Sequence, residues 1–441
     1  MDAARVRRLS PRARAGHVVA KVAVGLAMVW SVAACVSLVR RVQHGQTDFS
    51  VYYRSALAVQ GGVGPEFYRQ TDEPTGWLYC IPPPGTMLFA YMPWLSIGAA
   101  AAVWGLLNLA LLALCGWALW RIVGRLERHR RLYQSAAPWA LFLLLILSTD
   151  SLQVGQFSVL FVACWLVYLA VDHELLGAAL LALPATIKLY PALLWGAPMA
   201  LRDWRRVRWL APTTLVISLV LPLALYGARL PGMWQGFFAA TLFGGAKSRL
   251  MVSLNPSLAT QQSLDVALLR YLADLPDFAQ THPGFPHLRL DAGLVLGLVA
   301  LLKLCILVAT AVAAWRLGVR ARRRPRWTAL LMLALWSAAM WLLLPDTKSR
   351  YAVYLFAAWL PLLAMTAAQR GQRWRYGGCC VLLALGVASV VQAMPHALRL
   401  YGPACFASLA IWAILLRTAW RDGARANDVA AATAIPSQDS P

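Results

Sequence analysis

The sequence predicts an all-α polytopic membrane protein with about twelve transmembrane passes, some of them short and broken, and two long extracytoplasmic loops. Three observations support this fold class. Of the 441 residues, 60% are hydrophobic and only 13% are charged, whereas roughly 25% are charged in an ordinary soluble domain. Many apolar runs also approach the ~20 residues that a helix needs to cross a bilayer. In lipid a helix satisfies its own backbone hydrogen bonds, so these runs are expected to cross the membrane as helices. The composition excludes a soluble globular fold.

The formal net charge of +23 indicates membrane topology rather than a nucleic-acid partner. A nucleic-acid-binding protein gathers basic residues on one face of a folded domain, but here they lie in short loops between apolar runs. Loops rich in Lys and Arg stay on the cytoplasmic side of a membrane. The basic loops expected on that side are 121–131, 202–208, 316–326 and 370–375.

The remaining segments follow from the same two patterns. Residues 1–17 are basic and precede an apolar run at Val18–Val39, which predicts a cytoplasmic N-terminus and a retained signal anchor. Residues 18–420 are expected to form one transmembrane domain, and the polar residues 421–441 a disordered cytoplasmic tail. The further apolar runs lie at 98–120, 136–149, 155–171, 174–187, 189–201, 209–227, 291–317, 327–344, 351–367, 376–393 and 401–418.

The basic loops determine how the stretch 174–201 crosses the membrane. Loops 121–131 and 202–208 must lie on one side, so the number of crossings between them is even. This predicts two short passes, broken at Lys188, where prolines interrupt the apolar pattern. Short broken helices are tolerated at membrane depth where they face protein or a wet cavity. The alternative is one kinked helix, which would place the loop 202–208 outside.

Two long outer loops, 40–97 and 228–290, separate runs that are otherwise closely spaced. Loops of this length in a compact protein are usually functional. The first loop contains Asp48 soon after the first helix. A partly desolvated carboxylate there has a raised pKa and suits a general base. The alternative is that Asp48 caps the N-terminus of a helix that follows it.

Cations near the outer surface are candidates for binding an anion. Lys188 lies inside an apolar stretch, where an ionisable residue implies a partner or a ligand such as a phosphate. The alternative is that its side chain snorkels to the interface. Lys348 and Arg350 lie outside, against the charge rule. They form an anion site unless Asp346 pairs with them.

Polar side chains of the outer loops are candidate substrate ligands, because amides and carboxylates pair with hydroxyl-rich molecules. Asp150 and Gln156 lie in a short turn, for which a capped turn is the alternative interpretation. Tyr53 lies close to Asp48. Asn255 and Gln262 lie in a polar stretch of the second long loop. Neither the cysteines nor the scattered histidines show metal-ligand spacing, so no metal is predicted.

Six short motifs occur in an order that resembles glycosyltransferase family 87. The resemblance spans about residues 18–418, and each motif is weak alone. The motifs are Asp-Phe-Ser-Val-Tyr-Tyr at 48–53, Tyr-Cys-Ile-Pro-Pro at 79–83, Val-Gly-Gln-Phe-Ser at 154–158, Ile-Lys-Leu-Tyr-Pro at 187–191, Asn-Pro-Ser with Gln-Ser-Leu between 255 and 264, and Lys-Ser-Arg-Tyr at 348–351.

This resemblance implies a GT-C-type fold and a glycosyltransferase of the bacterial inner membrane whose active site faces the extracytoplasmic side. It implies transfer of a sugar, mannose or another hexose, from a polyprenyl-phosphate donor to an envelope glycan or glycolipid. Asp48 matches the catalytic acid of the family, Lys188 its lysine before a proline, and Gln156 the glutamine of its Gly-Gln turn. Ser158 departs from the pattern, which often has Asn there.

The expected mechanism is transfer with inversion. Asp48 would act as the base, and Lys188, Arg350 and Lys348 would bind the donor phosphate. Side-chain cations can neutralise a departing lipid monophosphate, so no cofactor or metal is expected. The alternatives are a secondary transporter of an anionic or lipid-linked solute and an envelope glycan polymerase or ligase that uses a lipid diphosphate. A transporter with inverted repeats should show a second broken helix pair, and the sequence offers only the one at 174–201.

Overall fold

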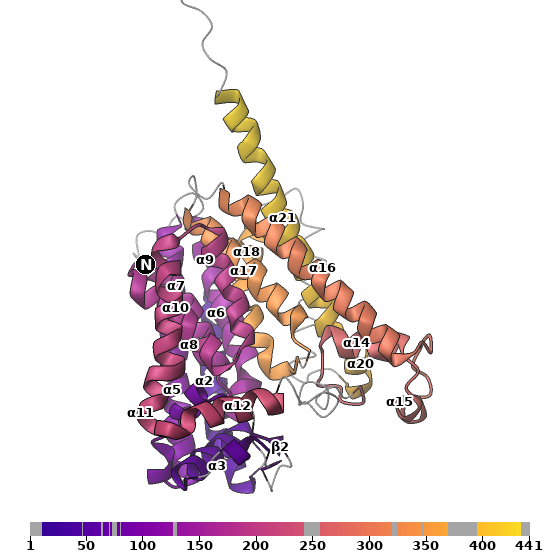
Figure 1. The fold of residues 1–441 in the computed structure, drawn as a ribbon. Helices are drawn as coiled ribbons and strands as arrows, with labels where there is room; N and C mark the ends of the chain where they lie inside the picture. The colour runs from indigo at the N-terminus through magenta and orange to yellow at the C-terminus, as the bar shows by residue number, and fades with distance from the viewer. Residues whose placement is uncertain are drawn as a thin grey trace, which may run out of the picture.

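The computed structural model describes residues 11–433 except 46, 63–64, 70, 73–76, 80, 127–129, 242–255, 320–324, 346 and 369–394. The chain folds into a bundle of helices with smaller elements at one end (Figure 1). The described strands are two residues each and form one short hairpin. The expected all-α class is therefore confirmed.

The longest helices are connected by short apolar helices and by one interrupted helical run. The long helices are α2 (Pro11–Arg41), α5 (Ile97–Arg125), α6 (Arg130–Val154), α16 (Ala292–Val319), α17 (Pro325–Leu343) and α21 (Pro403–Thr433). The shorter apolar helices are α7 (Ser158–Ala170), α8 (Glu174–Ile187), α9 (Gly196–Ala200) and α18 (Phe356–Ala368). The interrupted run comprises α10 (Trp204–Leu215), the π-helix η5 (Val216–Val220), α11 (Leu221–Tyr226), η6 (Gly227–Arg229) and α12 (Leu230–Thr241).

Among the described residues, 7 helices are long and apolar enough to cross a membrane. This supports a multi-pass membrane protein. Helices α7 and α8 have 13 and 14 residues and rise about 20 Å each, less than the ~30 Å of a hydrocarbon core. The expected number of twelve passes therefore stays a prediction, and the expected pass at 376–393 lies outside the described residues.

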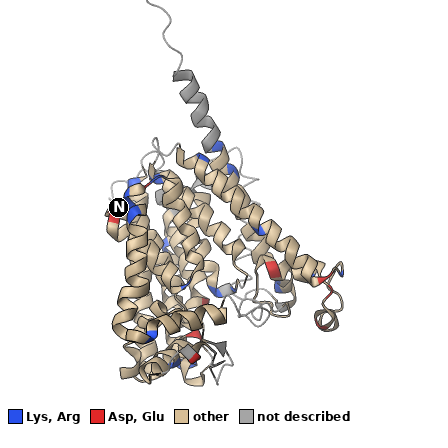
Figure 2. Cartoon of the chain, in the orientation of Figure 1, with Lys and Arg blue, Asp and Glu red and all other residues tan. Residues whose placement is uncertain are grey.

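Several Lys and Arg residues lie at one end of the bundle, which we call the basic end (Figure 2). Arg125 pairs with Asp172 there at 2.9 Å, and Arg326 donates to the Arg125 carbonyl. Arg208 pairs with Glu174 at 2.7 Å. The loops 121–131, 202–208 and 316–326, expected on one side of the membrane, thus have members in contact at the same end.

The stretch 174–201 begins and ends at the basic end. Arg206, just after this stretch, bonds the Val171 carbonyl before it. Between these points the chain runs away along α8, breaks at Lys188, and returns through η4 (Tyr190–Trp195) and α9. The indole of Trp195 donates to the Leu181 carbonyl and so ties the two arms together. The stretch is a pair of short arms, as the parity of the basic loops predicts, and not one kinked helix.

The opposite end of the bundle, which we call the site end, contains the two long loops. The first loop folds into η1 (Val42–His44), α3 (Asp48–Gln60), η2 (Pro65–Arg69), β1 (Thr71–Asp72), β2 (Trp77–Leu78), α4 (Pro83–Met87) and η3 (Met92–Trp94). Helix α12 lies crosswise above these elements (Figure 1), and an aromatic cluster that includes Phe67, Tyr79 and Phe237 joins it to them. The described residues of this loop are therefore packed into the fold.

The second long loop contains α14 (Leu264–Leu272) and α15 (Pro276–Thr281) after the last residues of α12. Its residue Gln262 donates its backbone N–H to the Thr347 carbonyl at 2.8 Å. This contact joins the loop to the segment before η9 (Ser349–Leu355). Helix α20 (His396–Leu400) precedes α21 at the same end.

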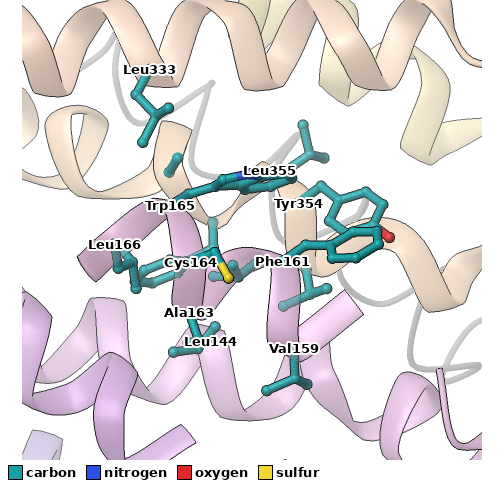
Figure 3. Packing of buried hydrophobic residues seen from close by; sticks show 14 of the residues in the cluster. Leu144, Val159, Phe161, Ala163, Cys164, Trp165, Leu166, Leu333, Tyr354 and Leu355 are labelled. Carbon is teal, nitrogen blue, oxygen red and sulfur yellow. The ribbon is translucent and has the colours of Figure 1, made fainter. Parts of the chain in front are cut away.

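The core of the bundle lies where α7, α17 and η9 meet, and it is rich in aromatic rings. Trp165 and Phe161 of α7 pack against Tyr354 of η9, with ring centroids 5.4 and 6.1 Å apart from it (Figure 3). All three side chains are almost fully buried. Because interiors are densely packed, this contact holds η9 in a fixed position against α7.

The C-terminal tail differs from the sequence-based expectation. We predicted disorder from residue 421, but α21 continues to Thr433. The tail is rich in alanine, and alanine has the highest helix propensity. The alanine residues therefore extend the helix as far as Thr433.

Candidate active site

Four segments that lie far apart in the sequence meet at the site end. They contribute Asp48 from the start of α3, Gln156 from the turn between α6 and α7, Lys188 from the break after α8, and Arg350 from η9. Sequence analysis selected all four, each for a separate reason. The structure brings them into one polar cluster, which we call the site cluster.

Asp48 is the first residue of α3, and it does not cap that helix. The cap is Thr47, whose hydroxyl accepts a hydrogen bond from the Ser50 N–H at 3.0 Å. The alternative interpretation of Asp48 as an N-cap is therefore wrong. Because Thr47 satisfies the helix terminus, the carboxylate of Asp48 is left to interact with the rest of the site cluster.

Arg350 forms an ion pair with Asp48 across 302 positions of sequence. The two side chains are only 18% and 14% exposed, so water screens the pair weakly. Asp150 lies near enough to act electrostatically on Arg350 as well. The alternative in which Asp346 pairs with Arg350 cannot be compared, since Asp346 lies outside the described residues.

The pKa of Asp48 lies below its usual value, which corrects the raised pKa that we predicted. Burial raises the pKa, as expected for a desolvated carboxylate. The positive charge of Arg350, a hydrogen bond from the Gln156 side chain and the charge of Lys188 together outweigh burial and lower the pKa. The carboxylate is thus held in its ionised form, which a general base requires, but its basicity is reduced.

A glycine shapes the turn that carries Gln156. Gly155 has a φ of +75°, a left-handed conformation that glycine adopts at no steric cost. A β-carbon at Gly155 would lie 2.5 Å from that of Phe49, the residue after Asp48. The absence of a side chain at this position therefore lets the turn approach α3 and brings Gln156 to Asp48.

Gln156 connects two other members of the site cluster with a neighbouring tyrosine. Its side-chain oxygen accepts hydrogen bonds from the Tyr52 hydroxyl at 2.9 Å and from the Lys188 ammonium at 3.2 Å. Its side chain also bonds to Asp48. With only 3% of its surface exposed, Gln156 fixes the positions of the base candidate and the cation relative to each other.

Lys188 lies among tyrosines at the break of the short arms. Its ammonium group is 4.8 Å from the centroid of the Tyr351 ring and 5.9 Å from that of Tyr190. It also donates to the Tyr351 hydroxyl at 3.4 Å. The ammonium group thus points into the site cluster, contrary to the alternative in which it snorkels away to the interface.

A chain of hydrogen-bonded hydroxyl groups holds the neighbouring tyrosines Tyr190 and Tyr354 in place. The hydroxyls of Tyr190 and Tyr354 are 2.7 Å apart, and the Ser158 hydroxyl donates to that of Tyr354 at 3.2 Å. Tyr351 and Tyr354 stack nearly parallel with centroids 5.7 Å apart. Ser158, the departure from the family pattern, therefore holds Tyr354 and does not face the Asp48 carboxylate.

Several predicted ligands have other roles in the fold. The Tyr53 hydroxyl donates to the Leu95 carbonyl. Gln262 is 2% exposed, and its amide bonds the carbonyls of Ala259 and Arg399 and the N–H of Ala404. Their side chains therefore hold loops together, and their assignment to substrate stays a prediction.

Two further predicted residues lie near Arg350, in sequence or in space. Lys348 forms an isolated antiparallel bridge with Gln261, two residues before Arg350. Asp150 lies close to Arg350, as its electrostatic effect shows. Asn255 lies outside the described residues.

Sequence reasoning missed Tyr52, Tyr190, Tyr351 and Tyr354. Helical spacing could have found Tyr52, because residues four apart share one face of a helix and Tyr52 follows Asp48 by four. Tyr351 and Tyr190 lie in the motifs that contain Arg350 and Lys188, so they could have been included with them. No local pattern indicated Tyr354, since its position depends on the packing of η9 against α7.

The site cluster combines one carboxylate with two cations, an amide and aromatic rings. A carboxylate can accept a proton, and cations can stabilise a developing anionic oxygen. Among the described residues, no group of three or more His, Cys, Asp or Glu side chains is placed to hold a metal ion. The chemistry that these residues offer is proton transfer beside an anion site.

Comparison with known proteins places this geometry in a family. The sequence profile of glycosyltransferase family 87 matches residues 77–345. The chain belongs to glycosyltransferase family 87. This match covers more than half of the chain and confirms the resemblance noted from its motifs. No curated protein and no solved structure matches the chain.

Membership of family 87 makes the chain a membrane glycosyltransferase, which uses a sugar donor and an acceptor. The matched region contains Gln156 and Lys188 but neither Asp48 nor Arg350. The site cluster of this family 87 protein thus joins two residues inside the matched region to two outside it.

Proposed function

We propose that this family 87 protein transfers mannose or another hexose from a polyprenyl-phosphate donor to an envelope glycan or glycolipid. The observation that supports this function best is the site cluster itself, in which a carboxylate lies beside two cations in a membrane glycosyltransferase. A lipid phosphate is the leaving group that two side-chain cations can neutralise.

The proposed location is the inner membrane of a bacterium, with the active site on the extracytoplasmic side. The basic end holds loops that the positive-inside rule assigns to the cytoplasm. The site cluster lies at the opposite end of the bundle, together with the described residues of the two long loops. The lipid tails of the donor would lie among apolar helices, and the acceptor would enter from the aqueous side.

In the proposed reaction, the oxygen of an acceptor hydroxyl attacks the anomeric carbon opposite the phosphate. The new carbon–oxygen bond forms as the bond to the phosphate oxygen breaks, so the anomeric configuration inverts. The acceptor proton passes to Asp48, and the lipid phosphate leaves with the bonding electron pair. Lys188 and Arg350, with Lys348 at the edge, would stabilise the negative charge on the phosphate.

The test is an assay of the purified protein with a panel of polyprenyl-phosphate sugars and glycan acceptors. We expect release of the lipid phosphate together with one new glycosidic bond of inverted configuration. Release from a polyprenyl-diphosphate donor alone would instead support the polymerase or ligase alternative. Movement of a lipid-linked solute across vesicles without release of lipid phosphate would support the transporter alternative. A retained anomeric configuration would contradict the single-displacement mechanism.

A further inference from the structure

In the proposed reaction Arg350 can pair with the Asp48 carboxylate or with the donor phosphate, but its guanidinium group cannot make the full forked contact with both at once. In the structure it binds Asp48, the candidate base. A guanidinium group also binds phosphate in the same forked geometry that it uses for carboxylate. A carboxylate that is already ion-paired is a weak proton acceptor, so the contact that holds Asp48 also inhibits it.

We propose that the donor phosphate displaces Asp48 as the ion-pair partner of Arg350, so that the base becomes active only once the donor is bound. This inference rests on the proposed function, because it requires a phosphate-linked donor. It assigns Arg350 a second task beyond binding the phosphate, namely control of the base. Arg350 would thereby make catalysis depend on the order in which the substrates bind.

The contacts of the site cluster place an incoming phosphate next to Arg350. Both cations act on the same carboxylate: Arg350 pairs with Asp48, and Lys188 is near enough to Asp48 to lower its pKa. A phosphate drawn to Lys188 therefore comes close to the Arg350 guanidinium group. The phosphate of the donor is a diester with one negative charge and two non-bridging oxygens, so it can take the forked contact in place of a carboxylate. As the bond to the sugar breaks, negative charge grows on the phosphate and strengthens its contact with the guanidinium group.

The groups that face Asp48 and Arg350 are consistent with such an exchange. The pKa of Asp48 is lowered by Arg350, Gln156 and Lys188. The charged form of the Arg350 guanidinium group is stabilised in turn by Asp48, Tyr351 and Asp150. When Arg350 moves to the phosphate, Asp48 loses its strongest cation while burial continues to act. The pKa of Asp48 then rises, and the carboxylate becomes a stronger base.

Thermodynamic linkage makes the exchange measurable without any turnover. If Asp48 and the phosphate compete for one arginine, removing the charge of Asp48 must tighten phosphate binding. Simple repulsion between the carboxylate and the phosphate would also tighten binding, but it would do so with or without Arg350. A double-mutant cycle over Asp48 and Arg350 separates the two causes.

The experiment measures binding of farnesyl phosphate to the full-length protein in phosphatidylcholine nanodiscs, with farnesol as the probe that lacks phosphate. For Asp48→Asn we expect farnesyl phosphate to bind about 5- to 150-fold more tightly, and farnesol to bind equally to both forms. In an Arg350→Gln background, the same Asp48 substitution should give a gain several-fold smaller. Glu66→Gln, which removes an exposed carboxylate of the same loop, is the matched control and should leave binding unchanged.

Unchanged or weaker binding by Asp48→Asn overturns the inference, and so does an equal gain in the Arg350→Gln background. Asp48→Ser is a second variant that removes the charge of the carboxylate. It keeps the test decisive if Asp48→Asn does not fold. The proposed function fails separately, if the wild-type protein releases no lipid phosphate from any polyprenyl-phosphate sugar. If the wild-type protein releases lipid phosphate but the Asp48 variants bind farnesyl phosphate no more tightly, the proposed function is supported and the exchange of Arg350 between Asp48 and phosphate is contradicted.

Discussion

Two buried ion pairs in this molecule have similar parts and different properties. One joins Asp48 to Arg350 in the site cluster, and the other joins Asp265 of α14 to Lys303 of α16. Side-chain exposure is 14% and 18% in the first pair and 11% and 14% in the second. Yet the pKa of Asp48 is lowered, whereas the pKa of Asp265 is raised.

The number of surrounding cations explains this difference. Burial raises the pKa of both carboxylates. Asp265 has Lys303 as its cation, and burial outweighs that charge. Asp48 has Arg350, Lys188 and the Gln156 hydrogen bond, and together they outweigh burial. The comparison teaches that a buried ion pair by itself does not indicate an anion site, whereas an excess of positive charge around the pair does.

The largest expected effect distinguishes the two carboxylates by activity. Asp48→Asn should lower the rate of sugar transfer by about 100-fold or more, since it removes the proposed base. Asp265→Asn is the matched substitution in the other pair and should leave the rate per folded molecule within about threefold. The measurement is the initial rate of lipid-phosphate release by each purified variant. Near-normal transfer by Asp48→Asn would remove Asp48 from the role of base.

The next effect distinguishes the two lysines. Lys188→Met should weaken use of the donor by about 10- to 100-fold, because a charge-assisted contact to the phosphate is worth about 1.5–3 kcal/mol. Lys303→Met should leave the KM for the donor unchanged. Steady-state kinetics with varied donor give both values. Equal KM values for the two variants would show that Lys188 does not bind the phosphate.

A smaller effect is expected in the pH profile. Because the pKa of Asp48 is lowered, its protonation should reduce kcat/KM in the wild type only at a pH below the usual range of an aspartate. Arg350→Gln removes a cation that favours the carboxylate, so the pKa rises and the acid limb should move to higher pH. The profile of residual activity in this variant provides the test. A limb that stays in place would mean that Arg350 does not control the ionisation of Asp48.

The smallest effect is expected for stability in the second pair. Lys303→Met alone leaves a buried carboxylate without its cation and should cost up to about 3 kcal/mol. Adding Asp265→Leu replaces the pair with apolar contacts and should recover most of that loss. Thermal unfolding in detergent would measure both variants. A double variant less stable than the single one would show that the pair stabilises α14 against α16 beyond what packing provides.

The sequence by itself determined the helical class, the multi-pass membrane character and the grouping of the three basic loops that the structure describes. It also selected Asp48, Gln156, Lys188 and Arg350, because a charge or amide next to an apolar run is unusual wherever that run folds. These features depend on composition and on neighbours along the chain, so they can be read without knowledge of tertiary contacts.

Only the tertiary structure decided how those residues act on one another. It paired Asp48 with Arg350 across 302 positions, reversed the predicted direction of the Asp48 pKa, and placed the Tyr52 hydroxyl against Gln156 while that of Tyr53 bonds to Leu95. It also showed the Gln262 amide engaged within the fold. The physical reason is that burial and charge act through distances in space, and residues far apart in sequence acquire those distances only when the helices pack.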